Sequence, residues 1–353
     1  MSVFGRAAAA AAAADGPRLM RKHTEIESLR TMECDTPVYD DFVQGFVARH
    51  GAGGETVVEL ARRYCETWPV PRAGDSDNSN NSSSSSEGAL RVGVMDSSFN
   101  PPHYCHGAYM ECLGIMELLP ASGPHGQRGE ARVLGIDAYL MLLGASNADK
   151  APGGATLEQR MRMVDMLATT VVQDTAADTW HLWKSREQFD ATNLHNMAIG
   201  MVNTPRFVDK CRAVEAVVRR EWARATGRPA AAAPRVLSYF AMGWDTLIRF
   251  FDARYYADYR AELDAFFERG GRIAYSRRVG FPDKDVDAFF ARPELAAYLQ
   301  YIFELRLPKR VKHISSSDVR LAVRDSTQSV RDIPPRILEF VNATQLYRQR
   351  PSS

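Results

Sequence analysis

The chain has 353 residues, of which 45% are hydrophobic and 25% charged, so it falls in the ordinary range for a folded protein with a sizeable core. Its 44 basic and 43 acidic residues leave a formal charge of +1, which excludes a general basic field that would hold nucleic acid or an anionic membrane. Any anion site must therefore be local. The five cysteines are odd in number and contain no CxxC pair, which argues against a disulfide framework and against a zinc site. We expect a cytoplasmic or nuclear location, no membrane or nucleic acid partner, and no metal site built by the protein alone.

The first 88 residues predict three segments. Residues 1–20, with alanine from Ala7 to Ala14, predict a disordered tail rather than an organellar transit peptide, because they have no apolar face and one serine. Residues 21–73 predict a helical N-terminal extension, since Glu25 to Arg49 and Thr56 to Trp68 carry apolar residues at helical spacing. Residues 74–88 contain no apolar side chain and predict a disordered Ser/Asn-rich linker. The functional domain is therefore expected over residues 89–353.

Residues 89–353 alternate short apolar runs with amphipathic stretches. This alternation predicts an α/β domain with a doubly wound, mostly parallel sheet covered by helices on both faces. The expected strands are Leu90 to Met95, Ala138 to Leu143, Met197 to Val202, Val236 to Met242 and Arg272 to Tyr275. The expected helices are His106 to Leu119, Leu157 to Thr170, Phe207 to Thr226, Asp258 to Arg269 and Pro335 to Tyr347. In such sheets ligands bind beyond the carboxyl ends of the strands, so the residues that follow each strand are the candidates for a site.

The run RVGVMDSSFNPPHYCHGAYMECL follows the linker and predicts a strand, a loop of small residues and prolines, and a helix that begins near His103. The free N–H groups and the dipole of that helix favour a phosphate above the loop. His103 and His106 are spaced i and i+3, so they share one face of the first helical turn and can reach the same group. Imidazoles placed there can donate hydrogen bonds to phosphate oxygens as negative charge builds up during a reaction.

The run KHISSSDVRLAVRD, far downstream, predicts a second helix N-terminus. Serines are good N-cap residues, and Arg320 lies about one turn into the helix that Ser315, Ser316 and Ser317 begin. Hydroxyl groups, free N–H groups and a guanidinium at one point suit the β- and γ-phosphates of a nucleotide.

The two runs together resemble the motifs of the nucleotidylyltransferase superfamily. SFNPPHYCH is similar to the signature (G/T)-(S/T)-F-(N/D)-P-x-H-x-x-H, and ISSSDVR is similar to ISSTxxR. Ser97 stands where a glycine is usual, and Cys105 stands where many members have the glycine of HxGH. Class I aminoacyl-tRNA synthetases share HxGH but need a KMSKS loop where this chain has ISSSDVR, so that interpretation is set aside.

Within the superfamily, the chain resembles the nicotinamide mononucleotide adenylyltransferase family, and it is most similar to divergent fungal-type members with DSSFNPP and GWDTLIRFFD. The segment GWD is similar to the family's G-A-D segment, with Trp244 in place of a small residue, and IPPRILEFVNATQLY is similar to its C-terminal helix. The resemblance runs from about Leu90 to Tyr347 and implies a Rossmann-like sheet of the nucleotidylyltransferase type.

The resemblance also implies site residues. The catalytic residues would be His103, His106 and Arg320. The ATP-binding residues would be Ser97, Ser98, Phe99, Asn100, Gly243, Asp245, Ile314, Ser315, Ser316 and Ser317. The mononucleotide would be bound by Asn147, Lys150, Arg160, Phe207 and Trp244. Trp180 is a rival to Phe207 for stacking on the pyridine ring, and Tyr255 and Tyr256 lie about where the family has another aromatic residue.

The implied reaction is transfer of AMP from ATP to nicotinamide or nicotinate mononucleotide, with release of pyrophosphate and with Mg²⁺ bound mainly through ATP. Two alternatives stay open at this point. One is a nucleotidylyltransferase with another acceptor, because the two phosphate motifs do not identify the acceptor. The other is an ATP-binding or ATP-hydrolysing protein of the same fold that acts in protein quality control. The sequence leaves open both the choice between the two mononucleotides and whether the chain forms a homo-oligomer.

Overall fold

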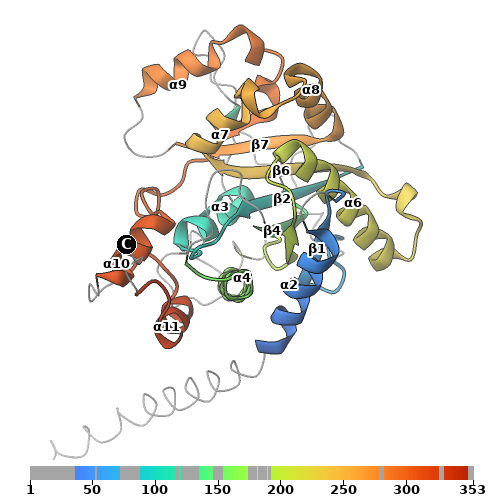
Figure 1. Ribbon diagram of the computed structural model, residues 1–353. Coiled ribbons are helices and arrows are strands. Elements are labelled where there is room, and N and C mark those ends of the chain that lie inside the picture. Colours follow the sequence, from blue (N-terminus) through green and yellow to red (C-terminus); the bar gives the residue numbers. More distant parts are fainter. Residues whose placement is uncertain are drawn as a thin grey trace, which may run out of the picture.

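The computed structural model describes residues 36–51, 54–71, 88–115, 119–120, 135–145, 154–173, 181, 189, 192–277, 282–325 and 330–348 (Figure 1). Several predictions lie outside these residues. They are the alanine-rich tail, the first part of the N-terminal extension, almost all of the Ser/Asn-rich linker, and the side chains of Asn147, Lys150 and Trp180.

In the described part of the chain, eight strands form one sheet in the order β1-β5-β4-β2-β6-β7-β8-β3. From β5 to β8 neighbouring strands run parallel, whereas β1 and β3 pair antiparallel at the two edges. The strands are β1 Val58–Arg63, β2 Ala89–Ser97, β3 Leu119–Pro120, β4 Ala138–Gly144, β5 Met197–Val202, β6 Arg235–Gly243, β7 Gly271–Ser276 and β8 Ile302–Glu304. The five predicted strands are β2, β4, β5, β6 and β7, so the predicted doubly wound parallel sheet is confirmed.

The helices lie on both faces of this sheet. They are α2 Thr36–His50, α3 Tyr104–Ile115, α4 Leu157–Val172, α6 Phe207–Thr226, α7 Trp244–Phe250, α8 Tyr259–Arg269, α9 Asp283–Phe290, α10 Ser316–Arg324 and α11 Pro335–Ala343, with short 3-10 turns at η2 Ala230–Ala232, η3 Ala253–Tyr255, η4 Pro293–Leu295 and η5 Leu299–Tyr301. The predicted helix Phe207 to Thr226 agrees with α6 at both ends. Gly227 ends the helix at its C-terminus in the left-handed conformation. No helix among the described residues is long and apolar enough to cross a membrane.

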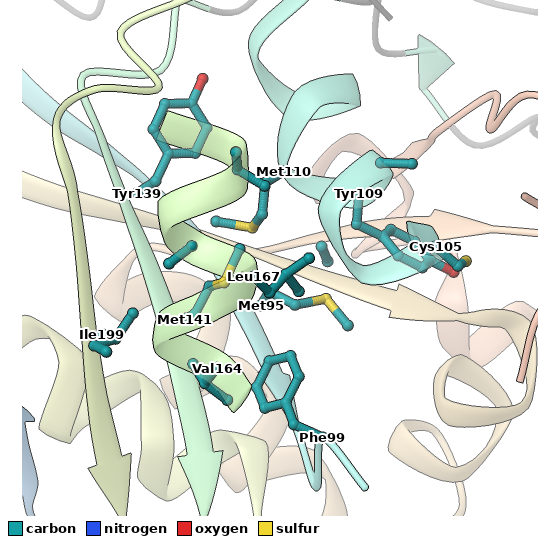
Figure 2. Close-up of a cluster of buried hydrophobic side chains, with 14 of the residues drawn as sticks. Met95, Phe99, Cys105, Tyr109, Met110, Tyr139, Met141, Val164, Leu167 and Ile199 are labelled. Carbon is teal, nitrogen blue, oxygen red and sulfur yellow. The ribbon is translucent and has the colours of Figure 1, made fainter. Parts of the chain in front are cut away.

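The core has two layers because successive side chains of a buried strand point to opposite faces. Val92 and Val94 of β2 pack in one layer with residues of α6, α7, α8 and α9. Met95 packs in the other layer with residues of α2, α3, α4, α10 and α11, part of which Figure 2 shows. The protein is thus a three-layer α/β sandwich.

The predicted helix from Thr56 to Trp68 is wrong, because this segment contains strand β1. Its apolar residues do recur at helical spacing, but the backbone pairs antiparallel with β5 and so completes an edge of the sheet. The strands approach closely at Gly200, where a Cβ atom would lie 2.4 Å from the backbone oxygen of Glu59. The first helix of the predicted extension is confirmed over α2. The segment that precedes the linker therefore contributes a strand to the main sheet.

The strand order reverses between β2 and β6. From β2 the chain proceeds outward through β4 to β5, and it then returns to β6 and proceeds through β7 to β8 on the other side. The carboxyl ends of these two strands are neighbours, since Met95 pairs with Ala241. The loops that leave them diverge, and this opens a crevice of the kind in which doubly wound proteins bind their ligands.

Candidate active site

A cavity of about 1390 Å³ lies at this crevice. It is lined by the loop after β2, the N-terminal ends of α3, α6, α7 and α10, the start of α4, and the turn at η3. Most of the predicted site residues line it. They are Ser97, Ser98, Asn100, His103, His106, Arg160, Phe207, Gly243, Asp245, Ile314, Ser315, Ser316, Ser317 and Arg320.

His103, which directly precedes α3, and His106 of its first turn stack on each other at this cavity. Their ring centroids lie 3.8 Å apart, and only 5% of His103 and 6% of His106 is exposed. The backbone N–H of His103 donates to Nδ1 of His106 over 3.1 Å, so a neutral His106 carries its proton on Nε2. That Nε2 atom lies 3.2 Å from Oγ of Ser97, at the wall of the cavity. His106 is therefore oriented as a hydrogen-bond donor toward the cavity.

Helix α10 contributes the second of the two predicted phosphate-binding elements. Ser315 is its N-cap, and its Oγ atom accepts a hydrogen bond from the backbone N–H of Asp318. Arg320 donates through Nη1 to the backbone oxygen of Asn100 over 2.7 Å and through Nη2 to Oγ of Ser317 over 3.1 Å. Ser316 Oγ donates to the backbone oxygen of Pro101 over 2.8 Å. The two motifs, more than 200 residues apart in sequence, are thus bonded directly to each other.

Asn100 links the loop after β2 to two further segments. Its Oδ1 atom accepts from the hydroxyl of Tyr347 over 2.7 Å and from the backbone N–H of Ala155 over 3.3 Å. Gly154 has a φ of +90°, and a Cβ atom there would lie 2.8 Å from the ring of Tyr347. Burial raises the pKa of the Tyr347 hydroxyl, which therefore stays protonated and able to donate. Sequence patterns gave no sign of this link beyond the Leu-Tyr ending of the C-terminal helix.

Arg160 of α4 approaches the same part of the cavity. Its Nε atom donates to the backbone oxygen of Ala155 over 2.8 Å. Burial lowers the pKa of its guanidinium, and the nearby charge of Arg320 lowers it further. Two cations held close together favour an anion between them, and the predicted role of Arg160 in binding the mononucleotide phosphate stays a prediction.

Aromatic side chains line another part of the cavity, near the N-terminal end of α6. Phe207 packs edge-on against Phe240 and Phe250, with ring centroids 5.7 and 6.1 Å apart. Tyr255 and Tyr256 also line the cavity. Asp96 and Lys210 form an ion pair at its wall that sequence reasoning missed, because 114 residues separate them.

Two predicted site residues lie in the core instead of at the cavity wall. Phe99 is fully buried at a φ of +43°, and Figure 2 shows its ring turned into the cluster around Met95 and Val164. Its ring attaches the loop after β2 to the core. Trp244 is 2% exposed and packs against Tyr275, Phe289 and Phe290. Direct contact of Trp244 with a mononucleotide would require this aromatic cluster to open.

Within the described residues, no group of three or more His, Cys, Asp or Glu side chains is arranged to hold a metal ion. The cavity carries hydroxyl groups, imidazoles and guanidinium groups where the two motifs meet, and among the described residues its carboxylates are those of Asp96 and Asp245. This donor set suits phosphate groups, with or without cations bound to them.

The fold and the site together define a three-layer α/β protein with a cavity where the strand order of its sheet reverses and where the N-terminal ends of several helices meet. A protein of Schizosaccharomyces pombe (strain 972) named "Putative nicotinamide mononucleotide adenylyltransferase" is 26% identical over 270 residues, which cover 73% of this chain and 86% of that protein. The resemblance to this family is therefore confirmed.

Other comparisons add little. No family model matches the chain. Two structures of Plasmodium falciparum nicotinic acid mononucleotide adenylyltransferase, complexed with NaAD and with APC, are similar with TM-scores of 0.46 and 0.43 at 12% identity. Each match covers 73% of this chain and 97% of that chain.

Proposed function

We propose that this protein is a nucleotidyltransferase that transfers AMP from ATP to nicotinamide or nicotinate mononucleotide, forms the dinucleotide and releases pyrophosphate. The observation that carries the proposal is the meeting of two helix N-termini at one cavity. His103 directly precedes helix α3, and His106 lies in its first turn. Helix α10 begins with a serine cap, and its Ser316 and Arg320 are hydrogen-bonded to the loop before α3. Such an arrangement binds a polyphosphate from two sides.

The reaction would be a direct displacement, in which the 5′-phosphate of the mononucleotide attacks the α-phosphorus of ATP. Positioning and charge stabilisation then supply the catalysis, and no nucleophilic side chain is needed. His106 would donate from Nε2 to an oxygen that gains charge in the transition state. Arg320 and the serine cap would bind the leaving pyrophosphate, and Asp245 would accept hydrogen bonds from a ribose.

Mg²⁺ would enter with ATP, whose phosphates supply its ligands, and its chemistry would be to neutralise phosphate charge. The residues of this cavity fit such a complex because they are mainly hydrogen-bond donors where the two motifs meet. They can therefore bind the phosphate oxygens that the metal ion does not coordinate. No residue of the chain is assigned as its ligand.

The test is a product assay with the purified protein, ATP, Mg²⁺ and each mononucleotide in turn. We expect dinucleotide and pyrophosphate in equal amounts. ADP and phosphate, formed equally well without a mononucleotide, would instead support the ATP-hydrolysing alternative. Turnover of another phosphorylated acceptor, with neither pyridine mononucleotide used, would support a nucleotidylyltransferase of different specificity.

A further inference from the structure

A buried ion pair lies at the wall of the cavity, beside the aromatic residues. Lys210 Nζ is 2.5 Å from Oδ2 of Asp96, and the two side chains are 4% and 10% exposed. Both residues line the cavity, Asp96 from the end of β2 and Lys210 from the first turn of α6. The ammonium group also lies 4.8 Å from the ring centroid of Phe207. The mechanism proposed above assigns no task to this pair.

The two oxygens of the Asp96 carboxylate have different surroundings. Oδ1 of Asp96 is buried and accepts no hydrogen bond from any residue that the structure describes. A buried carboxylate oxygen without a donor is costly, and buried polar atoms of this kind are generally satisfied. Since Asp96 lines the cavity, the missing donor can come from a bound ligand.

We propose that Asp96 and Lys210 recognise the 3-substituent of the pyridine ring and favour the carboxamide over the carboxylate. This inference rests on the proposed function. A pyridine ring stacked on Phe207 would bring its substituent within reach of Lys210, whose ammonium group lies beside that aromatic ring. The pair thereby selects nicotinamide mononucleotide over nicotinate mononucleotide.

The chemistry of the pair decides the direction of the preference. A carboxamide has both a donor and an acceptor, so its NH₂ group can donate to Oδ1 of Asp96 while its oxygen accepts from Lys210. A carboxylate has only acceptors, and one of its oxygens would face the Asp96 carboxylate. The pair is neutral as a whole, so a second carboxylate would leave a net negative charge in a buried place.

A phosphate-binding role for Lys210 is the competing explanation. Its charge is already balanced by Asp96, whereas Arg160 and Arg320 approach the cavity together near the two motifs. The two explanations make different predictions, because both mononucleotides carry the same 5′-phosphate. A phosphate contact would affect the two acceptors equally.

The experiment measures kcat/KM for both mononucleotides at saturating ATP, in the wild type and in Asp96→Asn. The wild type should favour the amide by roughly tenfold or more, the size expected for hydrogen bonds to charged groups. In Asp96→Asn the side chain can donate and Lys210 is no longer neutralised, so the ratio should shift toward the acid by roughly tenfold or more. The KM for ATP should not change.

Asp165→Asn is the matched control. Asp165 also accepts from a cation, Arg62, at 2.9 Å, and it does not line the cavity, so this variant should keep the wild-type ratio. A wild-type preference for the acid, or an unchanged ratio in Asp96→Asn, would overturn the inference while the proposed function stands. Turnover of neither mononucleotide by the wild type would overturn both.

A binding measurement covers the case in which Asp96→Asn does not fold. The thermal midpoint of the wild-type protein is recorded with equal concentrations of each mononucleotide, since at one concentration the ligand that binds the folded protein more tightly stabilises it more. The amide should raise the midpoint more than the acid does. Equal shifts would contradict the inference without use of any variant.

Discussion

Two regions of the cavity are built by different means. The proposed phosphate-facing region consists of the loop after β2 and the start of α10, joined by hydrogen bonds such as that of Arg320 to the backbone of Asn100. The proposed acceptor-facing region consists of aromatic side chains such as Phe207, held in place by packing against core residues. The residues of the first region belong to two recognisable sequence motifs, although the bonds that join those motifs are long-range. The aromatic residues of the second region belong to neither motif. This difference explains why the sequence indicates a nucleotide chemistry more clearly than it indicates an acceptor.

The two regions should therefore make different contributions to catalysis. Donors fixed by hydrogen bonds are aimed at charge that develops during the reaction, so their loss should lower kcat. Aromatic groups that bind the ground state and the transition state equally should mainly change KM for the acceptor.

The largest effect is expected for His106→Ala. The substitution removes the Nε2 donor at the cavity wall, so turnover should fall by roughly 10²- to 10³-fold, as for other preorganised donors. It also removes the acceptor of the His103 N–H and the contact with the Phe99 ring, so we expect a destabilisation of about 1–2 kcal/mol. Dinucleotide formation and thermal midpoint are measured together.

His50→Ala is the control for this histidine, because His50 pairs with Glu59 away from the cavity. It should keep normal turnover. Near-normal turnover in His106→Ala would contradict the catalytic assignment, and a complete loss of folding would favour a structural role.

Arg320→Ala should lower turnover by about 10²-fold through loss of the cation at the phosphate-facing region. Part of the effect comes through the loop after β2, since the guanidinium also holds the backbone oxygen of Asn100. Arg324→Ala is a matched control on the same helix, because Arg324 pairs with Asp325 and does not line the cavity. If both variants lost the same activity, the stability of α10 and not the position of the cation would be the cause.

Much of the fold could be predicted from the sequence because its strands are buried runs and its helices have recognisable ends. Leu157 to Val172 is an example, since Thr156 and Gln159 form a capping box at its start. Strand β1 could not be predicted, because its pattern is half exposed and its conformation is decided by pairing with β5. The local spacing of apolar residues favours a helix there, but pairing with β5 determines the conformation.

The candidate site could likewise be predicted only where its residues lie close together in the sequence. The residues of the two motifs lie at the cavity because strand, loop and helix succeed one another within a few residues. Contacts such as Tyr347 with Asn100, or Lys210 with Asp96, join positions more than 100 residues apart and leave no local signal. Trp244 follows the strand end as expected, yet its large ring packs into the core, which the type of residue alone did not indicate.

Phe207→Leu tests the acceptor-facing region. Leucine keeps an apolar side chain but removes the aromatic face, so KM for the mononucleotide should rise by about three- to tenfold, the worth of an aromatic contact. KM for ATP and kcat should change little. A large fall in kcat with unchanged KM would contradict the proposed difference between the two regions. Phe207 would then belong with the groups, such as His106, that act on the transition state.

The smallest effect is expected for Tyr347→Phe, which removes one hydroxyl at the edge of the phosphate-facing region. That hydroxyl donates to Oδ1 of Asn100, which also accepts from the backbone N–H of Ala155, so the loop keeps one of these two supports. A single neutral hydrogen bond contributes about 0.5–1.5 kcal/mol, and we expect a loss near the lower end, about threefold in turnover, because the second donor remains. Tyr298→Phe is the matched control, since its hydroxyl donates to Asp264 away from the cavity and its loss should leave turnover unchanged. A rise in KM for the mononucleotide with normal turnover would instead assign Tyr347 to ground-state binding, and the boundary between the two regions would then have to include the C-terminal turn.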